Sequence, residues 1–236
     1  MTGRPATISI ILGLLLFISC FAGCHHAPDA RRVFLHSESA LDAVRSLRMH
    51  VETYGALPRV TDAEFACDQD VIRYVTVQGM SNAPSLKVER IQTAKYLFAR
   101  SLAPSATDWQ RTGRQFLPPG VCSRLESPGV QSYLTSHLFS ADEAHSLPPF
   151  FSFANEQRAT ITHDGDESVD GVLCEIWTIR EGNNLANLPQ TVGIAVGDRL
   201  PRKYLQGERD NLLAVVNYSD YGQTIQIQLS PSDAGY

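Results

Sequence analysis

Charged residues are scarce in this chain, and its basic residues never form a cluster. Only 19% of the 236 residues are charged, with 20 Lys and Arg against 25 Asp and Glu, and no run of Lys or Arg occurs. Proteins that bind nucleic acid neutralise backbone phosphates with grouped cations. We therefore expect no nucleic-acid partner.

The chain also lacks the motifs of common catalytic and nucleotide-binding sites. It contains no Gly-x-Ser-x-Gly, His-Glu-x-x-His, Walker or Gly-x-Gly-x-x-Gly pattern. The adjacent His25 and His26 are more typical of a polar linker than of a metal site. In the acidic stretch 164–170, Val169 stands where a calcium loop needs glycine. We predict a protein that is not an enzyme, with no catalytic residues, no metal and no cofactor.

The longest apolar run lies near the N-terminus and indicates a secretory signal. Arg4 precedes the apolar residues 8–18, which are too few for a membrane span. The following residues, Phe-Ala-Gly-Cys24, resemble the lipobox of bacterial lipoproteins, in which the cysteine is lipidated. We therefore predict a signal peptide at 1–23 and lipid attachment at Cys24. Lipidation at Cys20 and a plain secretory signal are the alternatives.

Export of this kind has consequences for location and for cysteine chemistry. The lipobox resemblance implies acylation, as with palmitate, and anchoring in the cell envelope. His25 replaces the Asp that retains such proteins in the inner membrane, so we expect the outer membrane, facing the periplasm. Disulfides persist there, and Cys67, Cys122 and Cys174 allow three pairings. Cys174 also fits the role of a small buried apolar residue.

A tether is predicted at 24–36, and a short helix is predicted from about Val33, so that the two overlap. Ser37 or Ser39 can cap this helix, and Leu41 and Val44 follow at helical spacing.

Strand patterns dominate the rest of the chain. Leu47, Met49 and Val51 alternate with polar neighbours, as in a strand with one buried face. Turn-forming pairs such as Asp164-Gly165 separate the apolar segments. Further strands are expected at 71–77, 86–91, 95–100, 160–163, 172–179, 191–196, 202–205, 212–218 and 224–229. About ten strands joined by hairpins predict one large antiparallel sheet.

The segment 118–156 interrupts this pattern. It is rich in proline and has helical stretches near 130–139 and 142–145. We expect its helices to cover the concave side of the sheet, because an open apolar face invites aggregation. Phe150, Phe151 and Phe153 are either ordinary core residues or contacts for a ligand.

Several short stretches resemble the LolA-like and LppX-like lipoprotein (lipoprotein carrier) families of bacterial envelopes. They are VDGVLCEIW at 169–177, VGIAV at 192–196, LPRK at 200–203 and YSDYG at 218–222. The resemblance implies a mainly β (α+β) fold. The expected fold is an incomplete antiparallel half-barrel of about ten strands, with short helices on the concave face. We expect it to form a domain at 37–230, followed by a polar tail at 231–236.

The same resemblance implies a cavity for acyl chains. Strand alternation supplies the candidate lining, which is Leu47, Met49, Val51, Ile72, Tyr74, Tyr96, Phe98, Phe150, Phe151, Val172 and Ile176. The leading hypothesis is a lipid-anchored envelope protein that binds or carries a hydrophobic ligand, either lipid or lipoprotein acyl chains. The alternative is a sensory or scaffolding lipoprotein that uses the same fold to bind an envelope protein partner.

Overall fold

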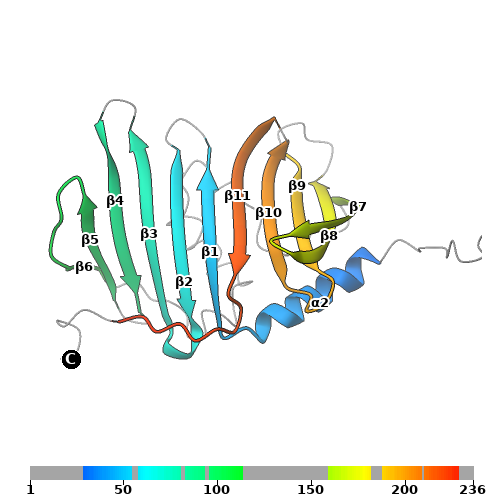
Figure 1. Cartoon of the computed structure of the whole chain (residues 1–236), viewed down its shortest axis with the longest axis horizontal. Helices are drawn as coiled ribbons and strands as arrows, with labels where there is room; N and C mark the ends of the chain where they lie inside the picture. Colours follow the sequence, from blue (N-terminus) through cyan, green and yellow to red (C-terminus); the bar gives the residue numbers. More distant parts are fainter. Residues whose placement is uncertain are drawn as a thin grey trace, which may run out of the picture.

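The chain folds around one antiparallel sheet of eleven strands (Figure 1). The structure is a computed structural model that describes residues 29–54, 58–80, 83–93, 96–113, 159–181, 188–208 and 210–228. The first six strands are β1 (Ser46–Thr53), β2 (Arg59–Ala66), β3 (Val71–Met80), β4 (Ala83–Gln92), β5 (Leu97–Ala103) and β6 (Gln110–Gly113). The other five are β7 (Ala159–Val169), β8 (Val172–Glu181), β9 (Gln190–Ala195), β10 (Pro201–Glu208) and β11 (Asn211–Ser219).

Two meanders make up the sheet. Strands β1 to β6 follow one another, as do β7 to β11, and β1 pairs with β11 to join the two halves. Strands β6 and β7 lie at opposite edges, so the sheet does not close. The predicted mainly β fold with an open antiparallel half-barrel is confirmed.

The curved sheet has a concave and a convex face, which we define by the register of β1 with its neighbours. Leu47, Met49 and Val51 lie opposite Phe65, Ala63 and Thr61 of β2 and share one face with them. This is the concave face, and its apolar side chains are almost completely buried. The intervening residues Arg48, His50 and Glu52 point to the convex face, as the period of two requires.

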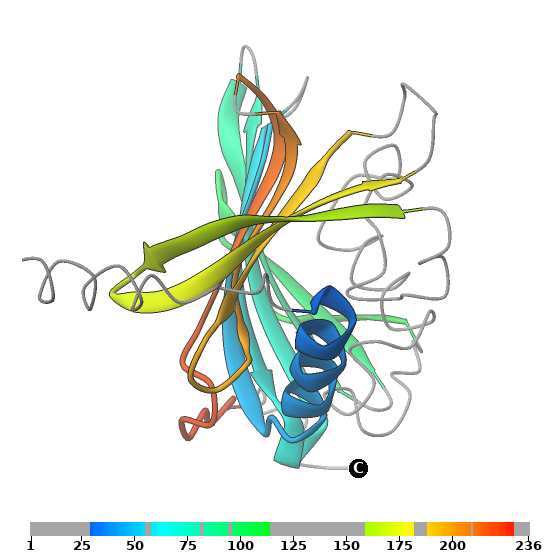
Figure 2. The same cartoon turned by 90° about the vertical axis from the view of Figure 1, so that its right-hand side faces the viewer.

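Helix α2 (Ala30–Asp42) lies on the concave side, at the end of the sheet formed by β7 to β9 (Figure 2). The Asp29 side chain caps it by accepting a hydrogen bond of 3.1 Å from the Arg31 backbone N–H. Its buried face includes Val33, Phe34 and Ser37.

The predicted cap of this helix was therefore wrong. Asp29 is the cap, and Ser37 and Ser39 lie inside the helix. Val33 and Phe34, which fall within the tether expected at 24–36, are buried in the core.

The C-terminal segment crosses the sheet on the opposite, convex side (Figures 1 and 2). Ile225 and Ile227 pack there against Ala66, Val71 and Ile91. The Ser46 hydroxyl donates to the Gln223 carbonyl oxygen, and the Gly222 N–H donates to the Ser46 carbonyl oxygen over 3.0 Å. The predicted strand at 224–229 was therefore wrong over its described part, because residues 224–228 pair with no strand.

The hairpin between β7 and β8 also differs from the prediction. Asp164-Gly165 forms a bulge within the hairpin, where the register shifts between His163 and Gly165. The turn lies at Asp170-Gly171, with φ values of 49° and 80°. Two successive residues with positive φ suit a two-residue hairpin turn, which requires that conformation.

Other predictions fall outside the described residues, and two strands were not predicted. The helical stretches at 130–139 and 142–145 and Phe153 are not among the described residues. Sequence patterns predicted neither β2 nor β6. Among the described residues, no helix is long and apolar enough to cross a membrane.

Candidate functional site

The middle of the concave face unites five of the predicted lining residues. Leu47, Met49 and Val51 of β1 share it with Ile72 and Tyr74 of β3, and all five side chains are at most 3% exposed. Strand β2 lies between them, so the five surround the concave residues of β2 in one cluster. Here the sequence located the apolar face correctly.

Tyr96 and Phe98 lie on the other face, contrary to the prediction. Leu97 pairs with Gln92, and Phe98 pairs with Ile91, whose side chain points to the convex side. The Tyr96 and Phe98 rings meet edge to face, with centroids 6.0 Å apart. The inward side chain at this point of β5 is therefore Leu97, one residue away from the prediction.

Val172 and Ile176 of β8 are also convex residues. They pack with Val169, Cys174 and Ala195 in a separate small cluster. Both faces of β8 are apolar, so alternation of apolar and polar residues could not distinguish them. The concave residues of this strand include Trp177 and Ile179, which pair with Val192 and Gln190 of β9.

Sequence analysis missed most of the rest of the concave face. Its buried members beyond the predicted set include Ala63, Phe65, Val192, Ile194, Val216, Tyr218 and Trp177. The alternation of Val216 and Tyr218 in β11 was a usable signal. Burial raises the pKa of the Tyr218 hydroxyl well above its ordinary value, so Tyr218 stays neutral.

Trp177 is the largest side chain at the helix-covered end. It is 2% exposed and meets the Phe34 ring of α2 edge to face at 5.7 Å between centroids. The His163 ring of β7 lies 4.7 Å from it. Trp177 thus connects the helix and the edge strand β7 with Val192 and Ile194 of β9.

A few polar groups interrupt the apolar concave face. The Gln92 side chain is fully buried, and its amide nitrogen and oxygen both lack a hydrogen-bond partner among the described residues. Within the same part of the chain, Thr53 Oγ1 and Trp177 Nε1 are likewise buried without a partner. Burying such a group unpaired costs about 1–3 kcal/mol in mutational data. An apolar surface with a small number of fixed polar groups is typical of ligand sites.

Arg90 adds a positive charge to the same face. It pairs with Tyr74 across β3 and β4, and its guanidinium lies over the Tyr74 ring, 5.8 Å from the centroid. Its side chain pairs with no carboxylate in the described part of the chain.

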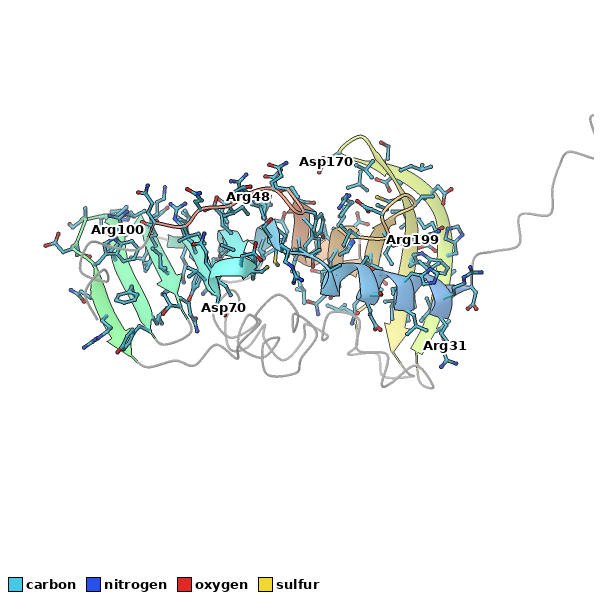
Figure 3. The ribbon with its side chains drawn as sticks, turned by 90° about the horizontal axis from the view of Figure 1, so that it is seen from below. Arg31, Arg48, Asp70, Arg100, Asp170 and Arg199 are labelled. Carbon is cyan, nitrogen blue, oxygen red and sulfur yellow. The ribbon has the colours of Figure 1, made fainter. Side chains whose placement is uncertain are left out.

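The convex face is organised by ion pairs instead. Arg48 and Arg100, which belong to these pairs, both lie on this side of the sheet (Figure 3). A ladder of alternating charges crosses it from β11 to β5, and its members are Asp220, Arg48, Glu64, Arg73, Glu89 and Arg100. Its distances run from 2.6 to 3.0 Å. Arg100 also lies over the Trp109 ring at 4.5 Å.

Glu89 is the most buried member of this ladder, with a side chain only 4% exposed. Burial by itself favours the neutral acid, but hydrogen bonds from Arg73 and Arg100 outweigh it and lower the pKa of Glu89. The carboxylate therefore remains charged and holds β3, β4 and β5 together.

His50 forms a second polar group on the convex face. Its Nδ1 lies 2.6 Å from Asp62 Oδ1, and its Nε2 lies 3.2 Å from Glu52 Oε1. The hydrogen bond with Asp62 is the main cause that raises the pKa of His50, against a smaller opposing effect of burial.

The cysteines have different states. Cys67 is disulfide-bonded to a cysteine outside the described residues, whereas Cys174 is free and fully buried. Burial raises the pKa of the Cys174 thiol, which agrees with the predicted role of Cys174 as a small buried apolar residue. Cys24, Phe150 and Phe151 lie outside the described residues.

No family model matches the chain, and no curated protein matches its sequence. Solved structures with a similar fold do exist. The Mycobacterium tuberculosis lipoprotein LppX is 13% identical over 85% of this chain and 100% of its own, with a TM-score of 0.49. A putative outer membrane lipoprotein-sorting protein domain from Vibrio parahaemolyticus is 13% identical over 86% and 94%, with a TM-score of 0.31.

A third similar structure is the MucA/MucB complex of Pseudomonas aeruginosa. It is 13% identical over 79% of this chain and 54% of the matched chain, with a TM-score of 0.40. An LppX lipoprotein and a lipoprotein-sorting domain are thus among the solved structures that this chain resembles. At these identities and TM-scores, the likeness says nothing of a ligand or a partner.

Proposed function

We propose that this protein is a lipid-anchored protein of the bacterial cell envelope that binds the acyl chains of a lipid or lipoprotein on its concave face. The main observation is the contrast between the two faces. Buried apolar residues form the concave face from β1 to β3, whereas a ladder of ion pairs crosses the convex face of the same strands. Each CH₂ group moved from water to such a surface gains about 0.8 kcal/mol.

The proposed anchor is Cys24, in the outer membrane and facing the periplasm. Helix α2 begins at Ala30, so only five residues separate it from Cys24. Even a fully extended connection of this length reaches about 20 Å. The N-terminal end of α2, and with it the β7–β9 end of the sheet, would therefore stay close to the lipid surface. Such proximity suits a protein that takes acyl chains from a membrane.

The proposed role is binding or carriage rather than catalysis. An apolar surface holds an acyl chain by burial alone, so the proposal requires no catalytic residue, metal or cofactor.

Native mass spectrometry of the purified protein, combined with lipid extraction, tests the ligand. We expect an acyl lipid to accompany the protein and to be released by organic solvent. Protein that carries no lipid, and takes up none from vesicles of bacterial lipid extract, would contradict the proposal.

A second candidate function is recognition of an envelope protein partner. The observation in its favour is β7, an eleven-residue strand at the edge of the sheet that pairs only with β8 among the described strands. An exposed edge can accept a strand from another chain. Cross-linking in intact cells tests this alternative. A discrete protein adduct through β7, together with an empty concave face, would favour partner binding over lipid binding.

A further inference from the structure

We propose that Arg90 and Gln92 together bind the headgroup of an acidic amphiphile, a single-chain lipid that ends in an oxyanion such as a carboxylate. This inference rests on the proposed function and names the ligand class. Both residues belong to β4, two positions apart, and therefore project from the same concave face.

The Gln92 amide is the first reason for placing a headgroup here. It lies in a lateral row between Ile72 and Leu97, both apolar and buried. The side chains of these two neighbours offer the amide no hydrogen-bond donor or acceptor. A ligand oxygen, in contrast, would accept a hydrogen bond directly from the amide nitrogen.

Arg90 supplies the charge. The arginines of the convex ladder are paired with carboxylates, whereas the Arg90 guanidinium lies over the Tyr74 ring and pairs with no carboxylate in the described part of the chain. Its guanidinium can therefore donate to an incoming oxyanion without breaking an ion pair. A rise of about 3.3 Å per residue separates Arg90 and Gln92 by about 7 Å along the strand. One oxyanion with a hydrogen bond of about 2.9 Å on each side bridges a gap of this order.

The remaining concave surface fits the acyl chain. From Tyr74 the rows of the sheet continue through Ala63 to Met49, all buried. The site thus combines a cation and an amide with an adjoining apolar track. This combination matches the acidic headgroup and the acyl chain of a fatty acid or a lysophosphatidic acid.

The experiment uses the full-length protein in phosphatidylcholine vesicles with photoactivatable palmitate, the matching palmityl alcohol and a lysophosphatidic acid. We expect palmitate to label the protein at least tenfold more efficiently than the alcohol. Arg90→Met and Gln92→Met should each weaken palmitate labelling, by roughly tenfold for Arg90→Met, since hydrogen bonds to charged groups are the stronger ones. Palmitate and lysophosphatidic acid are the two sources of an oxyanion. The one that competes better for the labelled site identifies the headgroup.

Two control variants match the two changes. Arg111 lies over the Tyr96 ring at 4.9 Å on the convex face, so Arg111→Met removes the same type of contact from the wrong side. Gln206 is a second buried concave glutamine, but its side chain is not among those with unpaired atoms, so Gln206→Met should lower stability without affecting labelling. Arg90→Lys keeps the charge and should retain most of the labelling.

The outcomes separate this inference from the proposed function. If acid and alcohol label the parent equally, or if Arg90→Met and Gln92→Met are labelled like the parent, the headgroup assignment is wrong although the concave face binds lipid. If neither probe labels the parent, the proposed function itself fails. Thermal unfolding of each variant confirms that it is folded, and we expect Gln92→Met to be at least as stable as the parent.

Discussion

Strand β1 shows most directly how the two faces of the sheet differ. Met49 and Val51 point to the concave side and are buried among apolar side chains, whereas Arg48 and His50 point to the convex side and contact carboxylates. The concave face depends on the removal of apolar surface from water. The convex face depends on hydrogen-bonded charge pairs that remain partly solvated. This difference teaches that only one face of the sheet can accept an acyl chain without first losing ion pairs.

The largest effect is expected from Trp177→Ala, which removes the concave side chain that joins α2 to the sheet. We expect a loss of about 3–5 kcal/mol in the free energy of unfolding, since the cavity would be large and the Phe34 contact would be lost. Denaturant-induced unfolding monitored by circular dichroism measures it. A loss below about 1 kcal/mol would show that α2 is held by other contacts.

Leu97→Asp and Tyr96→Asp compare the two faces at adjacent residues. Leu97 is concave and 8% exposed, so a carboxylate there should cost about 3 kcal/mol. Tyr96 is convex and lies beside Arg111, so the same change should cost less than about 1 kcal/mol. Thermal unfolding of the two variants checks the order. The reverse order would mean that the faces of β5 are exchanged.

Glu89→Gln tests the convex ladder. It removes the carboxylate that Arg73 and Arg100 share, and we expect a loss of about 2 kcal/mol. Lipid binding should be unchanged, because the side chain is on the other face. Urea unfolding measures the loss of stability, and palmitate labelling of the same preparation measures lipid binding. Reduced labelling at unchanged stability would contradict the separation of the faces.

The smallest effect is expected from pH at His50. Hydrogen bonding to Asp62 raises its pKa above the ordinary 6.5. The protonated form is thus favoured in the folded state, and its contribution is complete below pH 6.5 and is lost as pH rises through the raised value. Stability of the parent should decrease from pH 6 to pH 8 by more than that of His50→Gln. If stability changes with pH equally in the two proteins, His50 does not contribute to the stability of the convex face.

The sequence predicted the fold class and nine strands, because alternation is clear wherever one face is apolar and the other charged, as in β1. It failed where both faces are apolar, as at Cys174 and Trp177 of β8, since alternation then has no contrast. It missed β2 because Thr61 and Ala63 are weakly apolar and Glu64 finds its arginine partners only across neighbouring strands. Burial and pairing depend on those neighbours and are not local properties.

The candidate site was predicted in part for the same reason. The β1 and β3 residues were located correctly, but Gln92 and Arg90 had no signal in the sequence. A polar residue at the end of a strand is usually solvated. Only the register, which places Gln92 between Ile72 and Leu97, shows that its amide is buried on the concave face.

The central claim is that acyl chains bind on the concave face. Photoactivatable palmitate cross-linked to the parent protein, followed by peptide mapping of the adducts, tests it most directly. We predict adducts on the concave residues of β1, β3 and β4, such as Met49 and Tyr74. Adducts confined to convex residues such as Phe98 or Ile176, or no adduct within the sheet, would contradict the account.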